Sequence, residues 1–148
     1  MPLLNGPVVN GWAIIDVLVG ASEPRKRLLA KHKMRIPPPV HVRALIDTGA
    51  SMSGFAPRVF EELDLTPVTT GPILTPSTPP DAPASFDMYD VSLSLVAGGA
   101  SHPFPDTLVV AADCWHPGEG MEALIGVDIL SRCFFQFVGP ERRFTLAF

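Results

Sequence analysis

Apolar residues along this chain fall into short runs that alternate with polar residues or stop at glycine and proline. Residues 91–95 (VSLSL) alternate with a period of two, which is the pattern of a strand with one buried face. Short apolar runs of strand length predict further strands at about residues 8–19, 40–46, 68–74, 86–96, 107–112, 133–138 and 143–148. Asn10-Gly11 marks a bend in the first run.

Helical patterning is confined to two short pieces, one beginning at Pro57 and one following Gly126. The 17 prolines divide the chain into short segments, which favours strands and loops over long helices. We therefore expect an all-β fold, a small closed β-barrel with one or two short helices. The chain has 148 residues, the size of one compact domain, so a single domain over residues 1–148 is expected.

Charge is distributed unevenly along the chain. The net charge of −4 disfavours nucleic acid as the main partner. Six of the 11 Lys and Arg residues, however, lie between positions 25 and 35, inside an insertion at about residues 20–39. This basic run could tether the protein to an acidic partner, a membrane surface or RNA. A solvated insertion between two strands is the simpler interpretation, and we favour it.

The sequence also carries expectations about location. No apolar stretch approaches the roughly 18 residues that a membrane-spanning helix needs, so we expect no membrane span. The start of the chain has no basic region followed by a small-residue cleavage pattern, so no secretory signal is expected. Cys114 and Cys133 could pair, but free thiols in a cytoplasmic protein are the simpler expectation.

A carboxylate follows directly on the apolar run at residues 42–46. Asp47 is placed at the end of this predicted strand, and Thr48, Gly49, Ala50 and Ser51 form the turn that follows. A strand would hold the carboxylate rigidly, and glycine would let the backbone approach it closely. Taken alone, these are ordinary turn residues.

A second segment far downstream changes that interpretation. Leu124, Ile125 and Gly126 end another short apolar run just before a helical turn. The order and separation of the two segments resemble the retropepsin-like aspartic proteases, the single-lobe relatives of the pepsins. In that family an Asp-Thr/Ser-Gly turn carries the catalytic carboxylate, and a later apolar-apolar-Gly segment packs behind it. The resemblance covers roughly residues 40–148.

The resemblance implies a role for each residue of the turn. Asp47 would be the catalytic carboxylate, Thr48 would bond to its own copy across a two-fold axis, and Gly49 would offer its backbone N–H to the carboxylate. Ala50 and Ser51 would contact the substrate. Leu124, Ile125 and Gly126 would support the site from behind.

The resemblance also implies a flap, the hairpin that closes over substrate in this family. Its tip falls at residues 75–83, where Ser77 and Thr78 are candidate substrate-binding residues. Family flaps are often glycine-rich, whereas this tip contains four prolines, which lack a backbone N–H.

Catalysis of this kind requires two copies of the chain. Aspartic proteases use two carboxylates, one to activate water and one to protonate the carbonyl oxygen. This sequence has a single Asp-Thr-Gly, so the resemblance implies an aspartic endopeptidase that acts on protein or peptide substrates as a homodimer. The last strand either interleaves with its copy in the dimer or pairs within its own chain, and the sequence leaves both open.

Other chemistries have weaker support. Cys114 and His116, with His102, lack the second closely spaced ligand pair of a zinc site, so we expect neither metal nor cofactor. The proline-rich tip favours one alternative from another class, a non-catalytic module of the same fold that holds a peptide or dimerises without cutting.

Overall fold

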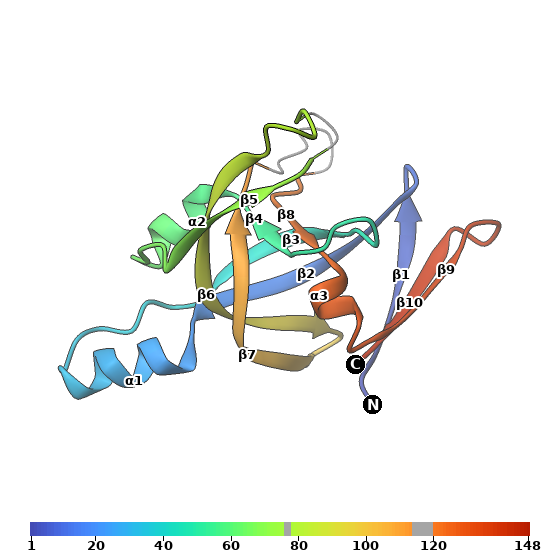
Figure 1. Ribbon diagram of the computed structural model, residues 1–148. Helices are drawn as coiled ribbons and strands as arrows, with labels where there is room; N and C mark the ends of the chain where they lie inside the picture. Colours follow the sequence, from blue (N-terminus) through green and yellow to red (C-terminus); the bar gives the residue numbers. More distant parts are fainter. Residues whose placement is uncertain (76–77, 114–119) are drawn as a thin grey trace.

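The computed structural model describes residues 1–75, 78–113 and 120–148 (Figure 1). The strands are β1 (Leu3–Val9), β2 (Trp12–Ala21), β3 (Val40–Ile46), β4 (Gly54–Phe55), β5 (Thr69–Ile73), β6 (Ala84–Ala97), β7 (Ala100–Ala111), β8 (Ala123–Ile125), β9 (Phe134–Val138) and β10 (Arg143–Ala147). The helices are α1 (Glu23–Lys31), α2 (Pro57–Glu62) and α3 (Val127–Leu130).

Six of the strands close into a barrel. Strand order runs β6-β7-β4-β8-β3-β2, and β2 pairs with β6 again to complete the ring. Alternate residues of these strands point inward, so Val17, Val42, Leu93 and Ile125 are fully buried or nearly so. The all-β closed barrel expected from the sequence is therefore confirmed.

The two ends of the chain form a second, smaller sheet beside the barrel. β1 pairs with β10 from Leu3 opposite Ala147 to Pro7 opposite Arg143, and β9 pairs with the other edge of β10. The two termini consequently lie next to each other (Figure 1). Phe144 and Leu146 of β10 are fully buried. Of the two arrangements that the sequence left open, the structure has the terminal strand paired within its own chain.

A nine-residue helix, α1, occupies the insertion that follows β2. The sequence predicted one or two short helices and missed this one. The Ser22 hydroxyl accepts a hydrogen bond from the N–H of Arg25, and Pro24 stands in the first turn, where a missing N–H costs nothing. These start signals were present in the sequence, but the helix has too few apolar residues to show a helical period.

Strand β7 is longer than predicted, because it continues through Pro103 and Pro105. Prolines argue against a strand interior, since they cannot donate to the ladder. Here the pairing with β6 shifts register between Val91 and Leu93, and the β7 residues opposite this irregularity include Pro105. Pairing with β4 reaches only the far end of β7, at Val110 and Ala111, so the prolines lie away from that contact.

Helix α2 is held against the barrel by packing and by an ion pair. Phe60 is buried, stacks on Tyr89 with ring centroids 4.0 Å apart, and meets Phe55 edge-on. Arg58 binds the carboxylate of Glu122, the residue before β8, through two nitrogens. This hydrogen-bonded pair lowers the pKa of Glu122 and raises the pKa of Arg58.

The β5–β6 hairpin extends beyond the barrel at the upper end of Figure 1. Thr78 and the following residues up to 83 contain no regular element, in line with the irregular tip expected at residues 75–83. Among the described residues, no helix has the length and apolar character needed to cross a membrane.

Candidate active site

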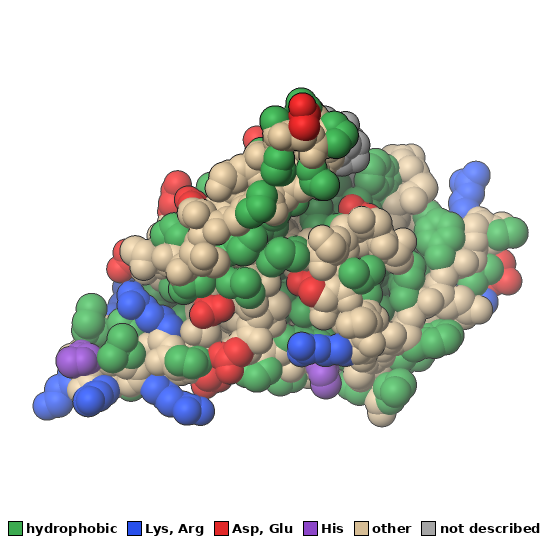
Figure 2. Space-filling model, in the orientation of Figure 1, with side chains coloured by type: hydrophobic (Ala, Val, Ile, Leu, Met, Phe, Trp, Pro, Cys, Tyr) green, Lys and Arg blue, Asp and Glu red, His purple; other side chains and the backbone are tan. Residues whose placement is uncertain are grey.

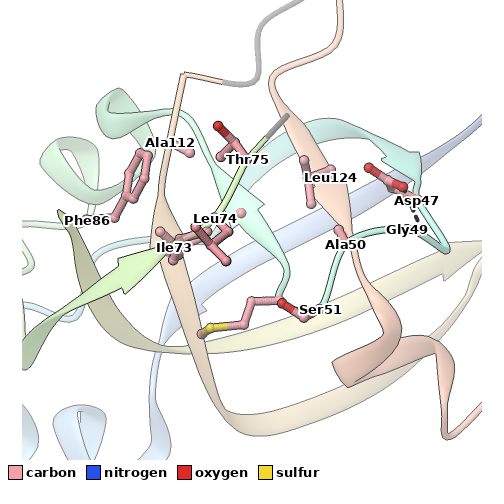
Figure 3. Close-up of a pocket in the computed structure, with 13 residues that line it drawn as sticks. Asp47, Gly49, Ala50, Ser51, Ile73, Leu74, Thr75, Phe86, Ala112 and Leu124 are labelled. Carbon is pink, nitrogen blue, oxygen red and sulfur yellow. Dashed lines mark hydrogen bonds between the residues drawn. The ribbon is translucent and has the colours of Figure 1, made fainter. Parts of the chain in front are cut away.

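Asp47 is the first residue after β3, and backbone contacts fix its position. Its N–H donates to the carbonyl of Ile125 at 2.9 Å, and the N–H of Gly49 donates to its Oδ1 at 2.9 Å (Figure 3). The N–H of Ala50 closes the turn on the Asp47 carbonyl at 3.2 Å. The carboxylate is half-buried, so the turn presents it while supporting one of its oxygens.

The segment at residues 124–126 packs directly behind this turn. β3 and β8 are parallel neighbours, with Leu45 opposite Leu124 and Ile46 opposite Ile125. A Cβ on Gly126 would lie 2.7 Å from the Ala50 carbonyl oxygen and 2.9 Å from the carbonyl of Met52. Both are backbone atoms, so only glycine fits without moving the turn. The structure thus brings the two sequence segments into contact.

Two residues without a predicted site role tie these segments together. The Ser53 hydroxyl donates to Oδ1 of Asp128 at 2.8 Å and accepts from the N–H of Gly126 at 3.0 Å. The N–H of Ser53 donates to the second Asp128 oxygen at 2.9 Å. Ser53 is fully buried. The sequence placed Asp128 only at a helix start, and no spacing rule links a serine to an aspartate so far along the chain.

A cleft of about 360 Å³ opens beside Asp47. Its wall is mostly apolar, with the β5–β6 hairpin on one side and the barrel on the other (Figure 3). The lining residues are Asp47, Gly49, Ala50, Ser51, Met52, Gly54, Ile73, Leu74, Thr75, Phe86, Val110, Ala112 and Leu124. Among these, Asp47 is the only one with an ionisable side chain. The predicted substrate-binding residues Ala50 and Ser51 are part of this wall.

Of the described residues in the hairpin tip, Thr75 lines the cleft. Thr78 does not line the cleft; its hydroxyl donates to the Thr75 carbonyl at 2.9 Å and accepts from the Thr75 N–H at 2.8 Å. The N–H of Ala82 donates to the Pro79 carbonyl at 3.1 Å. Ser77, the other candidate from the tip, lies outside the described residues.

Thr48 is exposed and belongs to a different surface from the cleft. It borders a hollow of about 330 Å³, which is lined by Gly11, Trp12, Ala13, Leu45, Ile46, Thr48, Phe135 and Phe137. Phe137 is 48% exposed there. An apolar hollow next to the Asp47 turn is a surface that another protein chain could cover.

The side chains that could ligate a metal do not gather in the described structure. Within residues 1–75, 78–113 and 120–148, no three His, Cys, Asp or Glu side chains form a group able to hold a metal ion. His102 packs against the rings of Phe104 and Phe148. Cys114 and His116 lie outside the described residues.

Comparisons with known proteins identify structures with a similar fold. No protein-family model and no curated protein matches the sequence. Among solved structures, the chain is similar to a retropepsin-like aspartic protease from Rickettsia conorii, with 15% identity and a TM-score of 0.59 over 98% of this chain and 90% of that one. It also matches EIAV protease in complex with an inhibitor, with 14% identity and a TM-score of 0.43 over 84% of this chain and 89% of that one.

The chain therefore has the retropepsin-like fold, as the sequence resemblance predicted. The match to the Rickettsia conorii structure extends over nearly the whole chain, including the terminal sheet as well as the barrel. At this level of identity the likeness defines the architecture, and the chemistry must be argued from the site itself.

Proposed function

We propose that the protein is an aspartic endopeptidase that acts as a homodimer, with Asp47 of each subunit forming the catalytic pair. The observation that carries the proposal is a single carboxylate, held by the N–H of Gly49, at an apolar cleft in a retropepsin-like fold. In this proposal the N–H of Gly49 supports the Asp47 carboxylate, and Thr48 bonds to its own copy across the two-fold axis. Ala50 and Ser51 contact the substrate.

The chemistry needs the two Asp47 carboxylates to meet. Two carboxyl groups in contact cannot both be ionised, because their negative charges repel, so the pair shares one proton. The charged carboxylate takes a proton from a water molecule, which attacks the peptide carbonyl carbon, while the protonated carboxyl donates to the carbonyl oxygen. Activity should then rise and fall with pH on the acidic side of neutrality, as a pH–rate profile would record.

The surface around Thr48 supports a dimer. Among the described residues that line the cleft of one chain, Asp47 alone has an ionisable side chain, which is half of the required pair. The apolar hollow beside Thr48, which Trp12 and Phe137 help to line, shares no lining residue with the cleft and would be covered by the second copy.

The cleft favours an extended peptide with apolar side chains near the cut bond. Ile73, Leu74, Phe86, Val110 and Leu124 contribute large apolar side chains to its wall. Burying an apolar side chain against such a wall is favourable, by roughly 1.5–3 kcal/mol for a large one. We therefore expect cleavage of unfolded proteins between apolar residues.

The test is cleavage of an unstructured protein by the wild type and by Asp47→Asn at several acidic pH values. The variant should lose activity by at least about a thousandfold, because both carboxylates of the pair are gone. Asp64→Asn is a matched control, since Asp64 is exposed and has a positive φ that asparagine also tolerates. Equal activity of Asp47→Asn and the wild type would refute the assignment.

A second candidate, a peptide-binding module without catalysis, is favoured by the hairpin tip. The N–H groups of Thr78 and Ala82 are engaged within the tip, which leaves them unable to hold a substrate in this conformation. Such a module would bind peptides equally well as wild type and as Asp47→Asn, and the wild type would show no turnover at any pH.

A further inference from the structure

We propose that residues 23–36, here called the basic arm, dock the protein on an anionic lipid surface. The arm comprises helix α1 and the segment that follows it. It stands away from the barrel at the lower left of Figure 1, and its cations gather at the same end of the molecule in Figure 2. This inference goes beyond the proposed peptidase activity and does not depend on it.

The arm is anchored mainly through Leu29, and its side chains from Arg27 onward are otherwise exposed as far as Ile36. Leu29 is the buried residue of α1. Arg27, Lys31, Lys33 and Arg35 carry the charge of the arm. In the described part of the structure, none of these four cations is paired with a carboxylate. Their charge is therefore available to a partner.

The charge of the remaining protein makes the arm selective. Residues 25–35 hold six of the 11 cations, and the other five stand against 15 acidic residues in the whole chain. The only acid within the arm, Glu23, binds Lys26 at 2.7 Å. An anionic surface would attract the arm and repel the body of the molecule, so docking should have one orientation.

Exposed apolar side chains between the cations favour lipid over other polyanions. Leu28, Met34 and Ile36 are 48%, 57% and 42% exposed. Apolar side chains flanked by Lys and Arg enter the boundary between lipid headgroups and acyl chains while the cations contact the phosphates. A single-stranded nucleic acid would instead favour aromatic residues for base stacking, and residues 23–36 contain no Phe, Tyr or Trp.

Docking through the arm would leave the candidate active site open. No residue of the arm lines the cleft at Asp47. Figure 1 draws the arm at the lower left and the β5–β6 hairpin at the top of the molecule. A protein held at the arm could therefore act on substrates near the surface that holds it.

Vesicle co-sedimentation of the full chain tests the proposal. Wild-type protein should bind phosphatidylglycerol–phosphatidylcholine vesicles, fail to bind pure phosphatidylcholine vesicles, and be released by raised salt, since salt screens exposed charges. The triple variant Arg27→Gln, Lys31→Gln, Arg35→Gln should bind at least about tenfold more weakly, because each cation contributes to attraction at an anionic surface.

Two further triple variants show whether the arm itself, and its apolar side chains, are responsible for vesicle binding. Arg132→Gln, Arg142→Gln, Arg143→Gln removes the same charge from exposed sites outside the arm and should bind like the wild type. Leu28→Ser, Met34→Ser, Ile36→Ser should weaken vesicle binding while keeping its salt dependence. Absence of wild-type binding to the anionic vesicles, or equal weakening by both triple charge variants, would overturn the proposal. So would tight binding to single-stranded RNA that is insensitive to the apolar variant.

Discussion

At the residue scale, the candidate site depends on Gly126, which lets β8 pack closely against the Asp47 turn, and on the hydrogen bonds that Ser53 makes there. The sequence predicted that Asp47 follows a strand and that the segment ending at Gly126 packs behind its turn. Each prediction came from a short local pattern, an apolar run followed by Asp-Thr-Gly in the first case and by glycine in the second. It did not predict the bonds among Ser53, Asp128 and Gly126, because hydrogen bonds between residues far apart in the chain leave no local pattern. Sequence reasoning placed Asp47 at the end of a strand and missed part of what holds the turn that follows.

Gly126→Ala should destabilise the fold and distort the Asp47 turn. The added methyl would lie 2.7 Å from the Ala50 carbonyl oxygen, so backbone must move, at a cost of about 1–3 kcal/mol. Urea unfolding followed by circular dichroism measures this. Gly139→Ala is the control, since its Cβ would meet only the Phe137 ring at 3.6 Å and should change stability little. Equal stability of both variants would contradict the prediction.

Ser53→Ala should also destabilise the protein. It removes the hydroxyl that bonds Asp128 and leaves the N–H of Gly126 without that acceptor in a buried place. Leaving buried polar groups unsatisfied costs about 1–3 kcal/mol. The free energy of unfolding of this variant should be compared with that of Ser51→Ala, which alters an exposed serine two residues away. A loss no larger than that of the control would show that the network contributes little.

At the element scale, most strands were predictable because each has a compact apolar run. Strand β3 was expected at residues 40–46 and is found at Val40–Ile46. The exceptions have physical causes. The first half of β7 was not predicted, because it contains prolines, which argue against a strand. Helix α1 was not predicted, because only Leu29 packs inward and the helix has no apolar stripe. Elements stabilised by a bulge or by capping escape a method based on periodicity.

The attachment of helix α2 should depend on pH through Glu122. Arg58 lowers the pKa of this carboxyl below its ordinary value of 4.5. The folded protein thus favours the charged form, and the resulting stability is complete above about pH 4.5 and lost as the pH falls through the lowered pKa. Glu122→Gln should cost roughly 0.5–1 kcal/mol near neutral pH and flatten the loss of stability in acid.

Thermal unfolding between neutral pH and about pH 3 measures this effect. Glu61→Gln changes an exposed carboxylate on the same helix and should leave the acid slope unchanged. If Glu122→Gln and the wild type lose stability in parallel as the pH falls, the Arg58 pair does not hold α2.

At the scale of the whole molecule, the hollow beside Thr48 predicts where two copies meet. Phe137→Asp should weaken the proposed dimer. Losing the burial of a phenylalanine, roughly 1.5–3 kcal/mol, would raise the dimer Kd by about ten- to a hundredfold. Peptidase activity per mole should fall at low protein concentration and recover at high concentration.

Analytical ultracentrifugation and activity at a series of concentrations give the two readouts. Phe134→Asp is the matched control, because Phe134 is 57% exposed on the same strand but points to its opposite face and does not line the hollow. An unchanged Kd for Phe137→Asp, or an equal increase for both variants, would place the interface elsewhere.

The pairing of β1 with β10 has a consequence for the order in which the chain folds. Leu3 lies opposite Ala147, so β1 can pair with β10 only after the residues between the two strands have been synthesised. Closing so long a loop is slow compared with forming a hairpin such as β5–β6. Until β10 has been made, Leu4 has no strand to pair with. Until β9 has been made, Trp12 lacks Phe135 and Phe137, which line the same hollow. A nascent chain should therefore need protection of β1 and Trp12 until β9 and β10 have been made, and the hollow beside Thr48 would be completed only then.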